Sequence, residues 1–333
     1  MAEIEAIAQE ETVDPGRQRE RLKIPKGTYF LLGTTLFERL AFYMVENSLI
    51  PFILDMKDDA HLADTYYNIF IVLIYATTLP AALLAETWTG GYKAWITMAM
   101  FSILGMIIFL FSSFPVSNRN VLLAEWPLFQ IGMYVYCLGI GGLKLTYTLG
   151  GDQYDPQDTD LISTHFSNLY IIANFGSIIV YFTYPFIQAE PLHLQDSEAP
   201  FTIPLIVATA SFFLALILMV SGRPYYKVVM PRKFTNVLDF FRCLWIGYVS
   251  QMRAWGRRLF SSWSSSEELK LSSVRACTDK RHHWLDKAEE KLGTYFVSDV
   301  KVVLNICGLF ALYPVFWTLY FQTVSYDCAD DMW

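Results

Sequence analysis

The chain has 333 residues, of which 54% are hydrophobic and only 17% are charged. Soluble domains carry about 25% charged residues, so the composition argues against an ordinary soluble domain and favours an integral membrane protein. The net charge of −7 says little about binding partners, because acidic and basic residues are segregated along the chain. The sequence has no catalytic triad, phosphate-binding loop or metal-ligand spacing. We therefore expect no enzyme, no metal site and no nucleic-acid partner.

The N-terminal segment, residues 1–26, is polar and lacks the apolar core of a signal peptide. After it, seven apolar runs are long enough to cross a lipid bilayer, for which about 20 apolar residues suffice. They cover approximately residues 28–54, 66–88, 94–114, 121–148, 165–188, 201–221 and 299–323. The predicted fold is therefore an all-α integral membrane protein.

The spacing of these runs divides the chain. Residues 27–221 form a predicted bundle of six spans, residues 222–298 a basic linker, residues 299–323 a seventh span, and residues 324–333 a short acidic tail. The stretch Gly222–Lys301 holds 15 of the chain's 25 Lys and Arg residues. Because basic residues concentrate in cytoplasmic loops, we expect the linker to be cytoplasmic. An even number of spans separates it from the N-terminal tail, which is then cytoplasmic too.

Part of the linker mixes aromatic and basic residues. Residues 234–260 combine Phe and Trp with Arg242, Arg253, Arg257 and Arg258. This pattern fits an amphipathic helix lying on the inner membrane face. A solvated helix packed beneath the bundle fits it equally well, and the sequence leaves both interpretations open.

Glu38 and Arg39 stand side by side in the middle of the first apolar run. Ionised groups at this depth cost several kcal/mol and normally have a function. On a helix, a face of about 140° collects the polar and aromatic side chains of this run. These are Thr35, Glu38, Arg39, Phe42, Tyr43 and Glu46. Such a face should line a polar cavity or pair with charges on another span, and Lys144 in the fourth span is the candidate opposite charge.

A second group of charges lies at the inner end of the second span. Glu86 and Lys93 flank the glycine pair Gly90 and Gly91. An acid, a glycine turn and a base in this order indicate a gating contact between spans. Ordinary interfacial charges remain the alternative.

Five motifs, in order along the chain, resemble the proton-coupled oligopeptide transporter family of the major facilitator superfamily, including its peptide/histidine branch. They extend over residues 28–325. The motifs are Glu38-Arg39 with Tyr43; Glu86 to Lys93; Gly141-Gly-Leu-Lys144 followed by Gly150-Gly-Asp152-Gln153; Phe166 to Ser177 around Asn174; and Phe316-Trp317 to Tyr320 and Gln322.

The resemblance implies secondary active symport of di- and tripeptides or histidine, driven by protons through alternating access, with no cofactor. In that family, residues matching Glu38, Arg39 and Lys144 exchange salt bridges as a proton loads. Residues matching Tyr43 and Asn174 contact the peptide. The chemistry agrees, because a buried carboxylate that takes up a proton releases its basic partner, and a free Lys or Arg can then bind a substrate carboxylate.

Several positions depart from the family pattern. The first glutamate of the first motif is Thr35 here, its first tyrosine is Phe42, and the proline after the lysine is Leu145. A histidine of the second span aligns with Asn68, and the position of a second arginine in the first span holds Glu46. These changes leave open whether transport is coupled to protons. They also invert the sign of one charge in the expected cavity.

The family has about twelve spans in two six-span bundles, with the substrate between them. We therefore expect this chain to be partial, and a membrane partner to complete the second bundle. The alternative is a non-transporting regulatory or scaffolding membrane isoform. A seven-span receptor is disfavoured by the cytoplasmic N-terminus and by the long loop between spans six and seven. The plasma membrane and endolysosomal membranes both fit a multi-pass protein of this kind.

Overall fold

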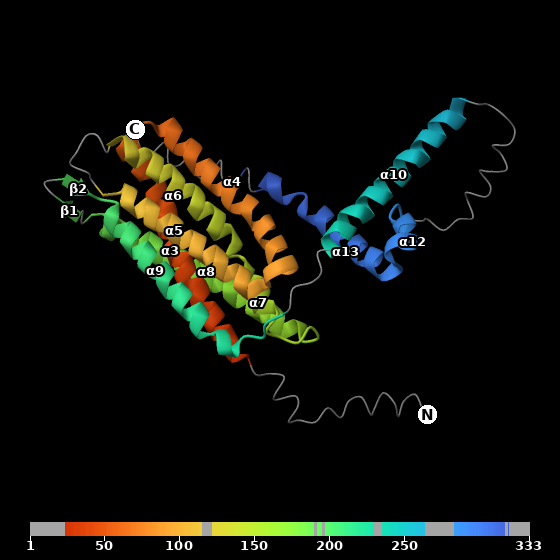
Figure 1. Cartoon of the computed structure of the whole chain (residues 1–333), viewed down its shortest axis with the longest axis horizontal. Helices are drawn as coiled ribbons and strands as arrows, with labels where there is room; N and C mark the ends of the chain where they lie inside the picture. The colour runs from red at the N-terminus through yellow and green to blue at the C-terminus, as the bar shows by residue number, and fades with distance from the viewer. Residues whose placement is uncertain are drawn as a thin grey trace, which may run out of the picture. The chain divides into compact units, whose positions relative to one another are not determined.

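Helices make up almost the whole of the computed structural model (Figure 1). The structure describes residues 24–114, 122–189, 192–194, 197–229, 235–263, 283–316 and 319. Residues 1–23 of the predicted N-terminal tail, residues 264–282 of the linker and the predicted acidic tail 324–333 lie outside the described residues. So do Trp317, Tyr320 and Gln322 of the last motif.

The chain divides into two compact units, Met1–Lys233 and Phe234–Trp333. The helices of the first unit form one bundle (Figure 1), which confirms the all-α prediction. They are α3 (Lys26–Lys57), α4 (Ala60–Leu84) with a π-helical turn at Ala85–Thr89, α5 (Gly91–Ser112), α6 (Leu122–Gly142), α7 (Leu145–Gly151), α8 (Thr159–Gln188) and α9 (Thr202–Ser221).

Within the described residues, six helices are long and apolar enough to cross a membrane. They span residues 60–89, 91–112, 125–151, 159–188, 202–221 and 294–316. They match the predicted spans from the second to the seventh. The predicted first span is α3, whose 32 residues are long enough but whose Glu38 and Arg39 lower its hydropathy.

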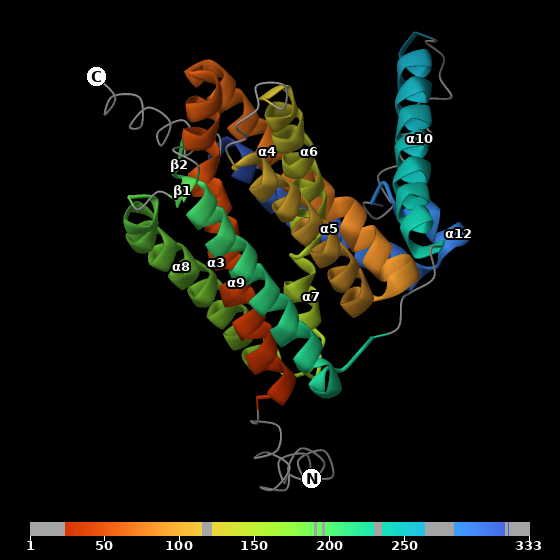
Figure 2. The same cartoon turned by 60° about the vertical axis from the view of Figure 1, so that its left-hand side comes forward.

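Helix α3 owes its place to packing rather than to hydropathy. It lies against α8 and α9 and also touches α4 and α7 (Figure 2). Its buried positions recur every three or four residues along the helix from Leu31 to Ile53. A transmembrane helix with charges in its middle must be covered by other helices on several sides. Helix α3 meets this requirement.

Small residues allow α5 and α6 to approach closely. A Cβ atom added at Gly105 of α5 would run into the backbone N of Tyr136 on α6. From the other side, a Cβ at Gly132 of α6 would lie 2.7 Å from the backbone N of Phe109. Small residues at such contacts let membrane helices pack by van der Waals contact, since lipid supplies no hydrophobic driving force.

The predicted fourth span, 121–148, is not one continuous helix. The structure breaks it at Leu143–Lys144, between α6 and α7. Gly141 and Gly142 directly before the break stabilise a helix poorly. Helix α7, which follows the break, is anchored to α5, because Trp95 Nε1 donates a hydrogen bond of 2.8 Å to Thr146 Oγ1. The break therefore leaves Lys144 at a turn inside the bundle.

The loop between α8 and α9 holds a small hairpin, which the sequence analysis did not predict. Strand β1 (Leu192–Leu194) pairs antiparallel with β2 (Ser197–Ala199), with His193 opposite Glu198. It leaves the helical class of the fold unchanged.

The first unit extends beyond residue 221, where the prediction ended the bundle. A 3₁₀ turn at Arg223–Tyr225 is followed by Tyr226, which is buried. The backbone N of Lys227 donates a hydrogen bond of 2.8 Å to Gln153 Oε1. These contacts tie the start of the predicted linker to the bundle.

The second unit contains α10 (Thr235–Trp263), a 3₁₀ turn at Asp286–Ala288, α12 (Glu289–Leu292) and α13 (Thr294–Phe310). Helix α13 begins five residues before the predicted seventh span, directly after Gly293, whose φ of 87° ends the preceding helix. A buried cluster joins these elements, formed by Cys243, Leu285, Ala288, Val297 and Val300. Lys301 adds ion pairs of 2.5 Å to Asp286 and 2.9 Å to Glu289.

The other side of α10 carries an exposed stripe of large apolar side chains. These residues are Phe241, Trp245, Tyr248, Met252 and Trp255. Their spacing of three and four residues places them along one side of the helix. The side opposite the stripe is the one that contributes Cys243 to the buried cluster. Helix α10 therefore has two apolar sides, of which the one with Cys243 is packed in the buried cluster.

We predict that Gly105→Ala destabilises the bundle, since its Cβ would press on the backbone of α6. Overpacking of this kind costs about 1–3 kcal/mol. Thermal unfolding of the purified chain in detergent should show a clear decrease in Tm. Gly308→Ala is the matched control, because a Cβ at this helical position meets nothing within 4 Å. Equal Tm values for the two variants would refute the close packing of α5 on α6.

Candidate functional site

Glu38 and Arg39 form a bidentate ion pair in the middle of α3. Arg39 Nε donates to Glu38 Oε2 at 2.7 Å and Arg39 Nη2 to Glu38 Oε1 at 2.6 Å. Glu38 is only 4% exposed. Adjacent residues on a helix usually point in different directions, so this pairing requires both side chains to bend toward each other. The two buried charges thereby neutralise each other.

Aromatic and small residues surround the Arg39 side chain. Its guanidinium carbon lies 4.9 Å from the ring centre of Phe42, a cation–π contact. From α8, Gly176 approaches so closely that an added Cβ would lie 3.1 Å from Arg39 Cβ. The glycine of the motif around Asn174 thus has a structural task, which is to let α8 pass beside the ion pair.

Lys144 comes to the same region from the turn between α6 and α7. Its Nζ lies 3.7 Å from the ring centre of Tyr75 on α4. The charges of both Arg39 and Glu38 act on it. Among the described residues, no carboxylate is within ion-pair distance of Lys144, because Glu38 is engaged by Arg39 instead. The predicted partner of Glu38 is therefore a near neighbour and not its direct partner in this structure.

Glu46 lies two helical turns further along α3. Its Oε1 accepts a hydrogen bond of 3.1 Å from the hydroxyl of Tyr67 on α4, and the charge of Arg39 acts on it. The sequence analysis noted Glu46 as a departure from the family pattern and did not identify its partner. Tyr67 belongs to another helix, so only the packing of α4 on α3 identifies it as the partner.

Tyr43 and Asn174 differ in how far they join this group. The Tyr43 ring packs 6.3 Å from the ring of Tyr181 on α8 and beside Phe42. Asn174 on α8 is exposed, and its side-chain amide donates to the backbone O of Tyr170 at 2.8 Å. The structure brings Tyr43 close to the ion pair. The Asn174 side chain bonds instead to the backbone of its own helix, two residues before Gly176.

Glu86 and Lys93 occupy a different place. Glu86 lies in the π-helical turn that ends α4, and Lys93 in the first turn of α5, on either side of Gly90 with its φ of 76°. Both side chains are exposed. In the part of the chain that the structure describes, neither is within ion-pair distance of an opposite charge. Their predicted gating role remains a prediction.

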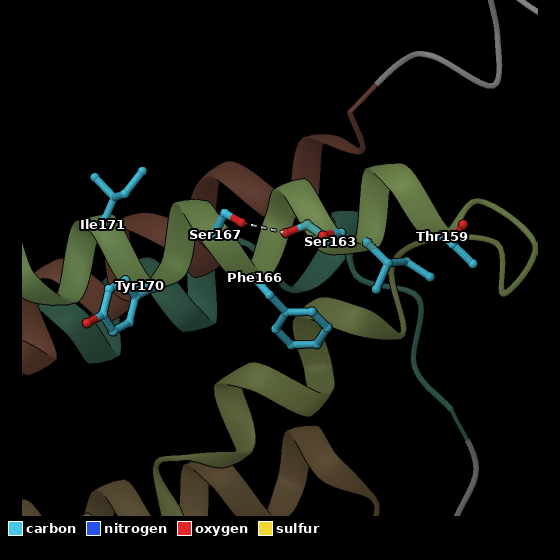
Figure 3. A pocket seen from close by; sticks show the side chains of 7 residues that line it. Thr159, Ser163, Phe166, Ser167, Tyr170 and Ile171 are labelled. Carbon is cyan, nitrogen blue, oxygen red and sulfur yellow. Dashed lines mark hydrogen bonds between the residues drawn. The ribbon is translucent and has the colours of Figure 1, made fainter.

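A hollow of about 660 Å³ lies along α8 (Figure 3). Its lining comes from that helix alone and consists of Thr159, Ile162, Ser163, Phe166, Ser167, Tyr170 and Ile171. Ser167 Oγ donates to the backbone O of Ser163 at 3.0 Å (Figure 3). Its lining offers hydroxyl groups but no charged side chain. We therefore place the candidate site at the charged cluster of Glu38, Arg39 and Lys144.

Within the described residues, no group of three or more His, Cys, Asp or Glu side chains is arranged to hold a metal ion. The charged cluster itself consists of ion pairs and hydroxyl groups. Two acids, two bases and several phenols in a low-dielectric interior can exchange partners when one acid gains a proton or when a charged ligand enters.

Comparison with known proteins identifies a family model, relatives and solved structures that resemble this chain. The family model PTR2, described as the POT family, matches residues 92–327. Solute carrier family 15 member 2 of Danio rerio is 27% identical over 304 residues, which cover 90% of this chain and 39% of the relative. Solute carrier family 15 member 1 of Homo sapiens is 25% identical over 311 residues, covering 90% and 41%. The chain thus spans about two fifths of the length of these relatives.

Solved structures show the same fold. The crystal structure of the POT family transporter PepTSo aligns with a TM-score of 0.61 at 21% identity, covering 90% of this chain and 61% of that chain. A second structure, of a proton-dependent oligopeptide family transporter, aligns with a TM-score of 0.56 at 22% identity, covering 88% and 62%. The likeness confirms the predicted fold class, a major facilitator six-helix bundle followed by a further span.

We predict that Arg39→Gln strongly destabilises the chain, because it leaves the Glu38 carboxylate buried without a partner. Breaking a buried pair from one side costs about 3–5 kcal/mol. Thermal or denaturant unfolding in detergent should show this loss, and the double variant Glu38→Gln/Arg39→Gln should recover most of it.

Arg242→Gln is the control for the loss of an arginine. Arg242 makes an exposed pair of 3.7 Å with Asp239, and such surface pairs contribute at most about 1 kcal/mol. A double variant that is as unstable as Arg39→Gln alone would contradict the paired geometry.

Proposed function

Since the chain belongs to the POT family, we propose that it is part of a proton-coupled symporter that carries di- and tripeptides or histidine by alternating access. The observation that carries this proposal is the buried Glu38–Arg39 pair with Lys144 beside it, inside a bundle of membrane helices. Ionisable groups within a membrane bundle mark substrate or proton pathways by default.

The pair supplies a way to couple a proton to a substrate. While Glu38 is ionised, it holds the Arg39 guanidinium through two hydrogen bonds. A proton on Glu38 cancels its charge and weakens both bonds, so Arg39 becomes free to bind a carboxylate. Lys144 has no ion-pair partner among the described residues and can bind the same carboxylate. The proton is the coupling ion, and no cofactor takes part.

Thr35 and Asn68 occupy two positions at which the family places proton carriers. The Thr35 hydroxyl donates to the backbone O of Leu31 at 2.9 Å, and the Asn68 amide donates to the backbone O of Asp64 at 2.9 Å. Both side chains satisfy local backbone groups and cannot carry a proton near neutral pH. We propose that Glu38 carries the coupling proton.

We propose that a second six-helix bundle completes the transport site. The matched relatives are more than twice as long as this chain. In transporters of this type the substrate binds at the interface of two halves. The bundle described here contributes one side of such a site. The alternative of a non-transporting scaffold gains no support from the comparisons.

The helices make the chain a multi-pass membrane protein. We propose a cytoplasmic N-terminus and a cytoplasmic linker, on the basis of their Lys and Arg content. For α10, the exposed stripe that includes Trp245 and Trp255 favours the inner membrane face over a solvated position. Such side chains are stable at the boundary of lipid and water. The plasma membrane and endolysosomal membranes both suit this proposal.

Proton-driven uptake of a labelled dipeptide into proteoliposomes tests the proposed function. With an inward proton gradient, the chain reconstituted together with the second six-helix bundle that completes its site should accumulate the dipeptide. Arg39→Ala should reduce the initial rate at least about tenfold, because the loss of one charge-assisted contact of about 1.5–3 kcal/mol changes binding by that order. Equal amounts of folded, reconstituted protein are compared.

Arg242→Ala, which removes an exposed arginine of α10, should leave the rate near that of the unaltered chain. Uptake by the unaltered chain that does not exceed uptake by Arg39→Ala would refute the proposal.

A further inference from the structure

Helix α10 carries two features that the proposed transport cycle does not use. One is the exposed stripe from Phe241 to Trp255. At 100° per residue, the side chains of this stripe fall within about 80° of arc. The other feature is charge, because residues 235–263 contain four arginines and a single acid, Asp239. The helix therefore combines an exposed apolar side with a net charge of +3.

The packing of the second unit places α10 at the end of a membrane span. Val297 and Val300, in the first turns of α13, belong to the same buried cluster as Cys243 of α10. Helix α13 is part of the segment 294–316, which is long and apolar enough to cross a membrane. Figure 1 shows α10 leading away from α13 rather than running alongside it. A helix joined to the end of a span and directed away from its axis lies along the membrane surface.

Arg253 stands at the edge of the stripe. It is exposed and lies about 120° around the helix from the middle of the stripe, whereas Cys243 of the packed side lies about 160° away. An arginine at such an edge keeps its methylene groups beside apolar surface and extends its guanidinium toward water. Arg242 lies on the same flank, but Asp239 is 3.7 Å from it and offsets part of its charge. With the stripe in lipid, the guanidinium of Arg253 is at the level of the headgroups.

A lipid surface fits this side of α10 better than a second copy of the chain does. Trp and Tyr side chains such as Trp245, Tyr248 and Trp255 are stable at the boundary of lipid and water. The span α13 keeps the bilayer within reach of the helix. A second copy would present another α10 with the same positive charge, whereas anionic headgroups attract basic residues close to a membrane surface. The charge of the helix therefore favours an anionic bilayer as its partner.

We propose that α10 binds anionic phospholipid headgroups, with the exposed stripe in the lipid and Arg253 at the level of the phosphates. This inference goes beyond peptide transport and rests on the membrane-surface position proposed for α10. It assigns the helix a ligand class, phospholipids with a net negative charge such as phosphatidylserine. Phosphatidylcholine, which has no net charge, holds the stripe but leaves the arginine without an opposite charge.

Hydrogen–deuterium exchange of residues 245–256 tests this proposal in the purified full chain, with one copy in each nanodisc. Backbone amides exchange when a helix opens locally, and binding to the bilayer opposes this opening. Discs of phosphatidylcholine are compared with discs in which about a third of the lipid is phosphatidylserine. Each basic residue near an anionic surface strengthens binding about fivefold. Phosphatidylserine should therefore slow the exchange at least about tenfold, and high salt should reverse this by screening.

Arg253→Gln should remove about a fivefold share of this effect, so that phosphatidylserine slows the exchange only about twofold. The position is exposed, so the variant should fold. Lys287→Gln is the matched control, because it removes one positive charge from an exposed position of the same unit, outside α10. It should keep the full slowing by phosphatidylserine.

The outcomes are distinct from those of the uptake experiment. Equal exchange in both kinds of disc overturns the proposal, and so does a slowing that persists unchanged in Arg253→Gln or in high salt. An equal loss in Lys287→Gln overturns the assignment to α10. Slowing that requires two copies in one disc identifies a protein contact instead and also overturns it. None of these results alters the proposed transport function, and a failure of uptake leaves the exchange result standing.

Discussion

The bidentate bond between Glu38 and Arg39 is the interaction on which the arrangement of the bundle depends. Either charge alone would be prohibitively costly in the middle of a membrane helix. Paired at 2.6 and 2.7 Å, they allow α3 to be buried between α8, α9 and α4 despite its low hydropathy. The same pairing makes the cluster switchable, since a single proton on Glu38 changes the net charge of the pair. Stability and the capacity to respond to protons therefore come from one contact.

Close packing positions the rest of the cluster around this pair. Gly176 lets α8 pass within contact of Arg39, and the break between α6 and α7 directs Lys144 to the ring of Tyr75. The glycine contacts between α5 and α6 fix the position of α6, which ends at this break. The contacts at Gly105 and Gly132 bring backbone against backbone, so they cannot relax as flexible side chains do. The charges are thus placed by rigid elements, which is what a site that exchanges ion-pair partners requires.

The sequence was sufficient to predict the helices and the members of the charged cluster, but not their pairing. Hydrophobic runs locate the helices to within a few residues because roughly 20 apolar residues are needed to cross a bilayer. Helical spacing placed Glu38, Arg39 and Glu46 on one side of α3. That Arg39 rather than Lys144 binds Glu38 is a feature of side-chain geometry with no strong local signal in the sequence. The partnership of Tyr67 with Glu46 also needed the α3–α4 packing.

The position of the cluster bears on what must cover it. Tyr75 on α4 and Tyr181 on α8 are both more than half exposed, although they contact Lys144 and Tyr43. Exposed apolar side chains on these helices are stable in lipid, but an ammonium group beside them is costly there. This side of the bundle therefore requires a polar cavity with a second wall. The matched relatives are more than twice as long as this chain, which agrees with the proposal that a second bundle forms this wall.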